Sequence, residues 1–109
     1  MGNESKRLAA NVFDATSYRA TDEEIKVLAA NMQLLQQRGL NKLNQRLMDG
    51  GRKIWDTFTE HNLAAKIARN HGPAAPILYE PEEEGLTRPP DLKITIGETM
   101  YWIQVLRAS

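Results

Sequence analysis

The spacing of apolar residues predicts helices over the first two thirds of the chain. A short helix is expected over residues 5–15, with Leu8 and Val12 on one side. Thr21 and Glu24 fit a capping box, in which the threonine caps a helical N–H and the glutamate reaches back to the cap residue. A second helix is therefore expected to begin here. Its apolar residues recur at helical spacing: Ile25, Leu28, Met32 and Leu35.

Glycines divide the rest of the helical pattern. Gly39 either ends the second helix or kinks it, because the apolar pattern resumes beyond it. The resumed pattern consists of Leu40, Leu43 and Leu47. The Asp-Gly-Gly sequence at 49–51 indicates a stop. A further helix is predicted from about Lys53 to Asn70, with the His-Gly-Pro sequence at 71–73 closing it. Its apolar stripe consists of Ile54, Phe58, Ala65 and Ala68.

The last third of the chain has the pattern of strands. Residues 77–79 are a short strand candidate and residues 81–85 a solvated loop. The two prolines at 89–90 impose an extended approach to the segment that follows. Two β-rich segments then flank Gly97 and Glu98, which together give the signal of a two-residue loop. The sequence therefore predicts a C-terminal β-hairpin.

The register of this hairpin determines which polar residues meet. A two-residue loop pairs Ile96 with Thr99. Counting back sets Asp91 directly opposite Gln104, and a loop shifted by one residue makes them diagonal neighbours on the same face. One face is apolar and requires helices packed on it: Leu92, Ile94, Ile96, Tyr101, Ile103 and Val105. The other face is too polar to be plain core: Asp91, Lys93, Thr95, Met100, Trp102, Gln104 and Leu106.

Composition restricts the class of protein. The chain has 109 residues, 41% of them hydrophobic and 26% charged, which suits one globular domain. The absence of cysteine excludes a disulfide scaffold, a cysteine-based zinc site and a cysteine nucleophile. No apolar run approaches the roughly 18 residues that a membrane span requires. The N-terminus leads into no signal core, so a cytoplasmic protein is expected. A net charge of zero argues against indiscriminate binding of polyanions.

These patterns together predict an α+β (α/β) fold in a single domain that spans residues 1–109. Residues 1–51 are expected to form a helical N-terminal extension. Residues 52–109 are expected to supply one helix and three strands. The N-terminal helices should pack on a small mixed or antiparallel sheet.

The hairpin brings a carboxylate and an amide oxygen together at Asp91 and Gln104. Hard oxygen ligands of this kind suit Mg²⁺, so the pair is a candidate half of a metal site. Glu60, in the middle of the helix predicted over residues 53–70, adds a second carboxylate. A helical glutamate taken alone is most often exposed. His61 and His71 do not have the spacing of metal ligands.

The order of these features resembles the restriction-endonuclease-like PD-(D/E)XK nuclease superfamily over residues 53–107. The order is a Glu-bearing helix, a strand, an Asp-led strand after proline, and a strand that carries Gln-Val. The resemblance implies a partial restriction-endonuclease-like core in which Asp91, after Pro90, binds the catalytic divalent cation. It implies that Gln104 stands at the second acidic position and that Glu60 completes the metal site. Mg²⁺ or Mn²⁺ would then be the cofactor and DNA the partner.

One position departs from the family pattern. The lysine that the family carries two residues beyond the second acidic position is Leu106 in this chain. Arg107 is adjacent, but strand alternation aims it at the opposite side, whereas Lys93 lies on the correct face and is the candidate catalytic replacement. The sequence also ends at Ser109, before the helix and strand that usually follow in the family. We therefore expect a fragment, a degenerate remnant, or a homodimer whose partner chain completes the sheet edge.

A basic series recurs every four residues at Arg38, Lys42 and Arg46, with Lys53 beyond it. On a single helix these residues would share one face and contact a nucleic-acid backbone. The alternative is an ordinary solvated helical face.

Three functions are consistent with these features. The first is a truncated or degenerate endonuclease-like domain with a remnant metal site, weakly active or inactive, that binds DNA or serves in assembly. The second is a helical module without catalysis that forms a homodimer or binds another protein. The third is an active Mg-dependent DNA nuclease that uses Lys93. The dimer contacts of the second would be Leu28, Leu35, Leu43 and Leu47.

Overall fold

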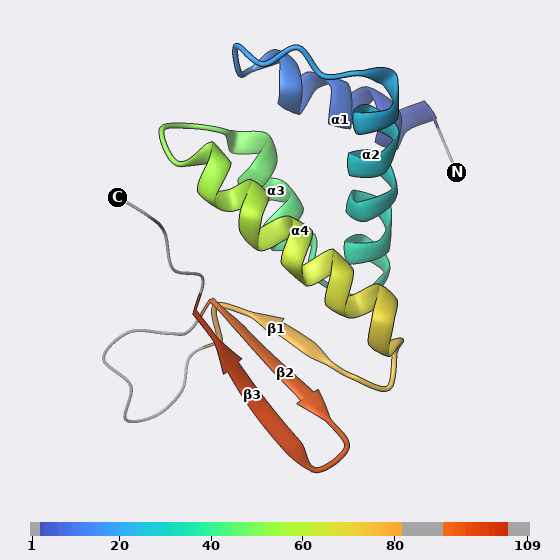
Figure 1. Cartoon of the computed structure of the whole chain (residues 1–109), viewed down its shortest axis with the longest axis vertical. Coiled ribbons are helices and arrows are strands. Elements are labelled where there is room, and N and C mark those ends of the chain that lie inside the picture. Colours follow the sequence, from blue (N-terminus) through green and yellow to red (C-terminus); the bar gives the residue numbers. More distant parts are fainter. Residues whose placement is uncertain (1–2, 82–90, 105–109) are drawn as a thin grey trace.

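The described residues, 3–81 and 91–104, form four helices and a three-stranded sheet in the computed structural model. The helices are α1 (Asn3–Asp14), α2 (Asp22–Gln37), α3 (Asn41–Asp49) and α4 (Ile54–His71). The strands are β1 (Ile77–Tyr79), β2 (Leu92–Ile96) and β3 (Thr99–Ile103), and the helices lie together on one side of the sheet (Figure 1). The predicted α+β class is confirmed. None of the described helices is long and apolar enough to cross a membrane.

Local signals set the helix boundaries. The Thr21 hydroxyl accepts from the Glu24 N–H at 3.1 Å and the Glu24 carboxylate accepts from the Thr21 N–H at 3.0 Å, which completes the predicted capping box. Gly39 has a φ of 78°, a conformation that glycine adopts without strain. Gly39 therefore ends α2 rather than kinking it, and α3 begins at Asn41.

The sheet is antiparallel, with the strand order β1-β2-β3. Ile96 pairs with Thr99 across the two-residue loop, so the predicted hairpin register is confirmed. The ladder continues to Leu92 opposite Ile103. Several predicted features lie outside the described residues: the prolines at 89–90, most of the loop at 81–85, Val105, Leu106 and Arg107.

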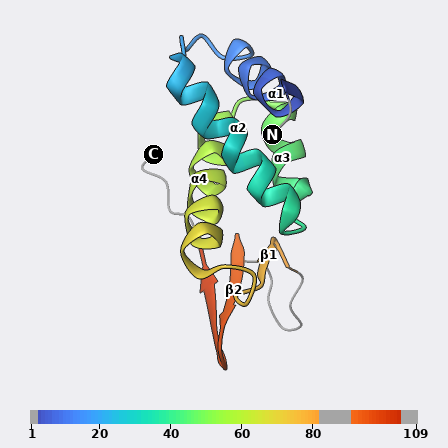
Figure 2. The same ribbon diagram turned by 90° about the vertical axis from the view of Figure 1, so that its right-hand side faces the viewer.

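Two clusters of buried apolar residues meet along α4. The first joins α1, α2 and α3 to the start of α4, and its members include Phe13, Met32, Leu47, Ile54 and Phe58. The second joins the end of α2, α3 and the later half of α4 to the sheet, and its members include Leu35, Leu43, Ala65, Ile77, Leu92 and Ile94. Figure 2 shows α4 running from the helical layer to the sheet. The N-terminal helices are therefore part of the same packed unit as the residues beyond position 51.

The helices cover only part of the apolar face of the hairpin. Leu92 and Ile94 are buried as predicted, but Ile96 is 37% exposed and Tyr101 49% exposed. The prediction of a fully covered face was wrong near the turn. β1 pairs with β2 only as far as Ile94, so the rest of the hairpin is a two-stranded extension of the sheet. Beyond that point the hairpin extends away from the helices (Figure 1).

Candidate functional site at the polar end of the sheet

Two of the predicted site residues, Asp91 and Gln104, lie where β1 finishes, β2 begins and β3 finishes, and Glu60 and Arg46 approach the same place. We call this the polar end of the sheet: Tyr79, Glu80, Asp91, Leu92, Ile103 and Gln104. Tyr79 pairs with Leu92, which pairs with Ile103. The Glu80 N–H donates to the Asp91 carbonyl at 2.9 Å. Asp91 directly precedes β2 and Gln104 directly follows β3, so the register brings them to neighbouring strand ends.

Glu60 approaches the polar end of the sheet from α4. Its exposed fraction is only 4%, so the ordinary expectation of an exposed helical carboxylate does not hold. The Tyr79 hydroxyl donates to Glu60 Oε2 at 3.4 Å, which is long for a hydrogen bond. The Leu92 side chain is buried between β2 and the helices. Because successive side chains of a strand point to opposite faces, Asp91 points away from the helices, and Gln104 lies on the same outer face. The three predicted ligands therefore share one end of the sheet but not one face.

Arg46 of α3 brings a positive charge to the same place. Its Nη1 donates to the Tyr79 hydroxyl at 2.8 Å and to Glu80 Oε1 at 2.7 Å. Hydrogen bonding to Glu80 raises the pKa of Arg46. The guanidinium carbon also lies 5.9 Å from the centre of the Tyr79 ring. Tyr79 thus accepts from Arg46 and donates to Glu60, and this chain of hydrogen bonds links α3, β1 and α4.

The Tyr79 hydroxyl stays protonated within this chain of hydrogen bonds. Burial first, and then the negative charges of Glu60 and Glu80, raise the pKa of Tyr79 above its usual value. A tyrosinate beside two carboxylates would be repelled by both of them. The hydroxyl therefore remains a donor toward Glu60 throughout the neutral pH range.

The predicted basic face is divided in the structure. Arg38 is the C-cap residue of α2 and Lys42 lies in α3, so the series does not run along one helix. The prediction of one continuous basic face was wrong because the positive φ of Gly39 breaks the helix between them. Arg38 donates to a backbone carbonyl of α4 at 3.1 Å. Arg46 donates to Glu80 at the polar end of the sheet. Lys42 and Lys53 are exposed.

Lys93, the candidate replacement for the missing lysine, lies on the outer face of the sheet. It pairs with Trp102 across the hairpin, and its Nζ is 5.5 Å from the centre of the Trp102 ring. Asp91 shares this face by strand alternation. Trp102 is 51% exposed. Leu106, which stands at the family's lysine position, lies outside the described residues.

The leucines predicted to form a dimer interface are buried inside the chain. Leu35, Leu43 and Leu47 are 0% exposed, and Leu28 is 3% exposed. They belong to the two core clusters. They are therefore not available to a partner chain.

The described residues at the polar end of the sheet do not form a preformed metal centre. Across residues 3–81 and 91–104, no group of three or more His, Cys, Asp or Glu side chains is arranged to hold a metal ion. Mg²⁺ is nevertheless commonly bound by one or two carboxylates together with substrate phosphates and waters. The Asp91 carboxylate and the Gln104 amide oxygen, on the outer face, match this smaller requirement in donor chemistry, whereas Glu60 lies on the covered face. A cation here would depend on a phosphate ligand for part of its coordination.

Sequence reasoning missed the chain of hydrogen bonds through Tyr79. Arg46 was predicted only as a nucleic-acid contact, and Tyr79 only as a strand residue. The two are 33 residues apart in the sequence, and Arg46 and Glu80 are 34 apart. No local pattern connects residues at such separations, so only the packing of α3 against the sheet reveals the unit.

Comparison with models of protein families, with curated proteins and with solved structures finds no match for the chain. The order α4-β1-β2-β3 is the order of elements that the resemblance to the PD-(D/E)XK superfamily implies. A relationship to that superfamily stays a prediction from the residues of α4 and the hairpin.

Proposed function

We propose that the chain is a nuclease-like domain whose polar end of the sheet binds a divalent cation together with a nucleic-acid phosphate, with cleavage weak or absent. The observation that carries the proposal is the hairpin register, which brings Asp91 and Gln104 to adjacent ends of β2 and β3. The order of the elements, α4-β1-β2-β3, supports the same interpretation. The register and the order of elements agree with the arrangement that the resemblance implies, whereas Glu60, on the covered face, does not join Asp91 and Gln104.

The residues at the polar end of the sheet have different roles in this proposal. Asp91 and Gln104 supply hard oxygen ligands from the outer side of the hairpin, whereas the buried Glu60 lies on the covered side and is not part of this ligand pair. When bound, Mg²⁺ or Mn²⁺ neutralises charge on a phosphate and activates water. Arg46 is paired with Glu80 at 2.7 Å, so in this proposal it holds the ends of the strands in place and adds no net positive charge.

The position of Leu106 limits cleavage. A lysine at that position would stabilise the charge that develops on the phosphate during attack, and leucine cannot. Lys93 shares the outer face with Asp91 and is the candidate substitute, so Mg-dependent cleavage through Lys93 is the second candidate function. Apart from Lys93, no lysine of the described residues lies on the strands that meet at the polar end of the sheet to take the place of Leu106. We therefore propose binding of a phosphate, and not cleavage, as the main function.

The proposal predicts binding of metal that depends on Asp91. In a Trp55→Phe background, Trp102 is the only tryptophan and lies two residues from Gln104. Its fluorescence should change on titration with Mg²⁺ or Mn²⁺. Asp91→Asn should abolish the change, whereas Glu98→Gln removes the same charge at the opposite end of the hairpin and should preserve it. Equal responses from the two variants would contradict the site.

A second assay separates binding from cleavage. With Mg²⁺ present, the Asp91→Asn variant should bind a duplex oligonucleotide about tenfold more weakly than the unsubstituted chain, an effect typical of impaired metal sites. Plasmid DNA incubated with the unsubstituted chain should remain largely supercoiled. Nicking that requires both Asp91 and Lys93 would replace the binding function with the nuclease alternative.

A further inference from the structure

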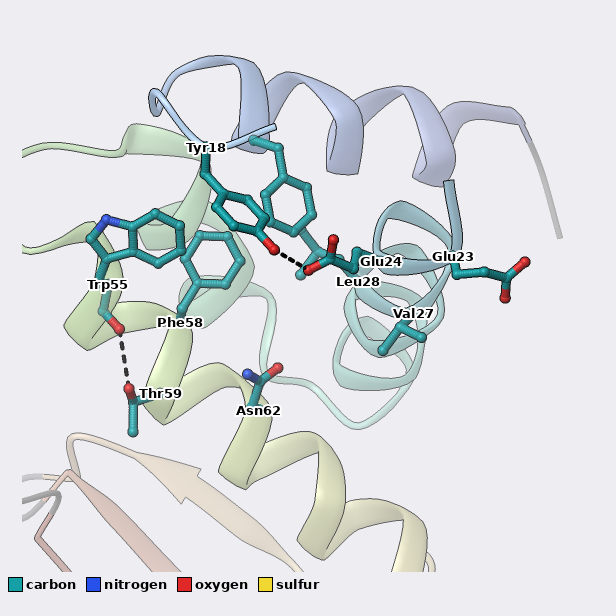
Figure 3. Close-up of a pocket in the computed structure, with 10 residues that line it drawn as sticks. Tyr18, Glu23, Glu24, Val27, Leu28, Trp55, Phe58, Thr59 and Asn62 are labelled. Carbon is teal, nitrogen blue, oxygen red and sulfur yellow. Dashed lines mark hydrogen bonds between the residues drawn. The ribbon is translucent and has the colours of Figure 1, made fainter. Parts of the chain in front are cut away.

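A groove of about 650 Å³ lies between the N-terminal halves of α2 and α4, away from the sheet. Tyr18, in the connection between α1 and α2, closes one end of the groove in Figure 3. Trp55 and Phe58 line its α4 side, and Glu24 and Val27 line its α2 side. The volume falls within the roughly 300–1,000 Å³ typical of pockets that bind small ligands. None of these residues belongs to the polar end of the sheet.

Aromatic rings form a continuous row along this groove. The Phe58 ring lies 5.3 Å from Phe13 and 5.1 Å from Trp55, and both pairs are stacked. The Tyr18 ring meets Trp55 edge to face, at 5.9 Å and 84°. Phe13 and Phe58 are buried, but Tyr18 is 46% exposed and Trp55 50% exposed. Two half-exposed rings at nearly a right angle form a corner whose electron-rich faces attract cations.

Glu24 adds a negative charge beside this corner. Its Oε2 accepts from the Tyr18 hydroxyl at 2.7 Å, and its Oε1 accepts from the Thr21 N–H at 3.0 Å. The hydrogen bond from the Thr21 backbone, and then that from Tyr18, lower the pKa of Glu24, so the carboxylate is charged at neutral pH. A carboxylate oxygen can accept more than one hydrogen bond. Glu24 can therefore accept a hydrogen bond from a ligand while it keeps its hydrogen bond from the Thr21 N–H.

The charge on Glu24 is not balanced by a cation in the described part of the chain. Asp22 pairs with Lys6 and Lys26 at 3.2 Å each, while Glu24 forms no ion pair within residues 3–81 and 91–104. Among the residues that the structure describes, no lysine or arginine lines the groove. The N-terminus of α2 contributes only about half an elementary positive charge. The groove therefore combines open aromatic faces with a net negative charge.

We propose that this groove binds an arginine side chain of a partner polypeptide. A guanidinium group is flat, so it stacks on an aromatic face and at the same time donates hydrogen bonds to a carboxylate. The Trp55 and Tyr18 rings supply the faces, and Glu24 supplies the acceptor. The aliphatic stem of the arginine and the residue beside it would cover Val27, which is 58% exposed. This binding is separate from the proposed metal site.

The test uses the full chain with Trp102→Phe, which leaves Trp55 as the only tryptophan. The probe is acetyl-Ala-Arg-Ala-amide, and its neutral counterpart carries citrulline in place of arginine. The arginine peptide should shift the Trp55 indole N–H signal in NMR spectra and bind roughly fivefold more tightly than the citrulline peptide. Glu24→Gln should remove this difference, because glutamine retains the capping box but not the charge. Glu98→Gln is the matched charge change on the hairpin and should retain the difference.

Calorimetry on single variants gives an independent check. Trp55→Ala should abolish binding of the arginine peptide, whereas Trp102→Ala removes an equally exposed tryptophan, 51% against 50%, and should not. Equal affinity for the two peptides, or no binding of either, would overturn the proposal. Free arginine that binds as tightly as the peptide would make the ligand a small molecule and overturn the assignment to a polypeptide. Self-association that buries Trp55, measured by sedimentation, would make a second copy of the chain the occupant and overturn the assignment to a different polypeptide.

Discussion

A buried pair of polar side chains, His61 and Asn44, joins α4 to α3. His61 is 0% exposed, and its Nε2 lies 2.7 Å from Asn44 Oδ1. Asn44 Nδ2 donates to the Met32 carbonyl at 2.7 Å, so Oδ1 is the accepting atom and His61 Nε2 carries the proton. His61 Nδ1 is then a buried acceptor without a hydrogen-bond partner among the described residues. Protonation of His61 would leave this hydrogen bond in place but would bury a positive charge and an Nδ1–H donor that has no partner among the described residues.

Acid should therefore destabilise the protein through His61. Burial lowers its pKa to about 4, whereas a histidine in the unfolded chain titrates near 6.5. Between these values the unfolded state binds a proton that the native state does not, so stability falls as the pH falls. Urea denaturation should show a loss of about 2 kcal/mol in the free energy of unfolding between pH 7 and pH 5.

Two histidine variants test the origin of this pH dependence. His61→Gln should remove most of it, because an uncharged amide can still donate to Asn44. His71→Gln changes the exposed histidine at the end of α4 and should leave it intact. A pH dependence that survives in His61→Gln would show that other groups cause it.

At the scale of single residues, the sequence predicts which apolar residues of a helix are buried but not which polar residues are. Ile54 and Phe58 were predicted on the inner stripe of α4 and are buried. Glu60 and His61 are buried on the same helix, although their polarity alone predicts exposure. Their partners, Tyr79 and Asn44, are 19 and 17 residues away in the sequence. Burial of such groups depends on these tertiary hydrogen bonds, which no local pattern reveals.

At the scale of elements, the helices and the hairpin follow from local chemistry. The capping box fixes the start of α2, and Gly39 separates α2 from α3. The two-residue loop fixes the register of β2 against β3, which is why the neighbouring positions of Asp91 and Gln104 could be predicted. How far the helices cover the hairpin could not be predicted, because it depends on the path of α4 over the sheet, which is a tertiary contact.

The capping box gives a prediction for α2. Thr21→Ala removes the side chain that accepts from the Glu24 N–H, so the free energy of unfolding should fall by about 1 kcal/mol. Thr21→Ser keeps the hydroxyl and should stay close to the unsubstituted chain. Urea denaturation at pH 7 measures both variants. An equal loss in the two would indicate that the threonine methyl group, and not the cap, stabilises the helix.

At the scale of the whole molecule, α4 joins two core clusters, one within the helices and one between the helices and the sheet. Within residues 3–81 and 91–104, the sheet is covered on one face only. Leu92 is 0% exposed on the covered face, whereas Leu78, on the neighbouring strand, is 51% exposed on the other. The position of the polar end of the sheet therefore depends on the packing of the sheet against α4.

Alanine substitutions of Leu92 and Leu78 test whether packing of the sheet against α4 stabilises the fold. Leu92→Ala should lower the free energy of unfolding by about 3 kcal/mol, because it leaves a cavity between the sheet and α4. Leu78→Ala is the matched change on the open face and should cost less than about 0.5 kcal/mol. Denaturant unfolding followed by circular dichroism compares the two. Similar losses would mean that the outer face of the sheet is also packed in solution.

Paramagnetic broadening by Mn²⁺ tests most directly whether the polar end of the sheet binds a divalent cation. Amide NMR signals of the ¹⁵N-labelled chain should broaden first at Asp91, Leu92 and Gln104, because broadening falls steeply with distance from the ion. Gly97 lies at the other end of the hairpin, roughly 15 Å away along a five-residue strand, and should stay sharp. Asp91→Asn should abolish the effect. Broadening centred on Asp22 and Glu23, or none at the polar end of the sheet, would contradict the proposed site.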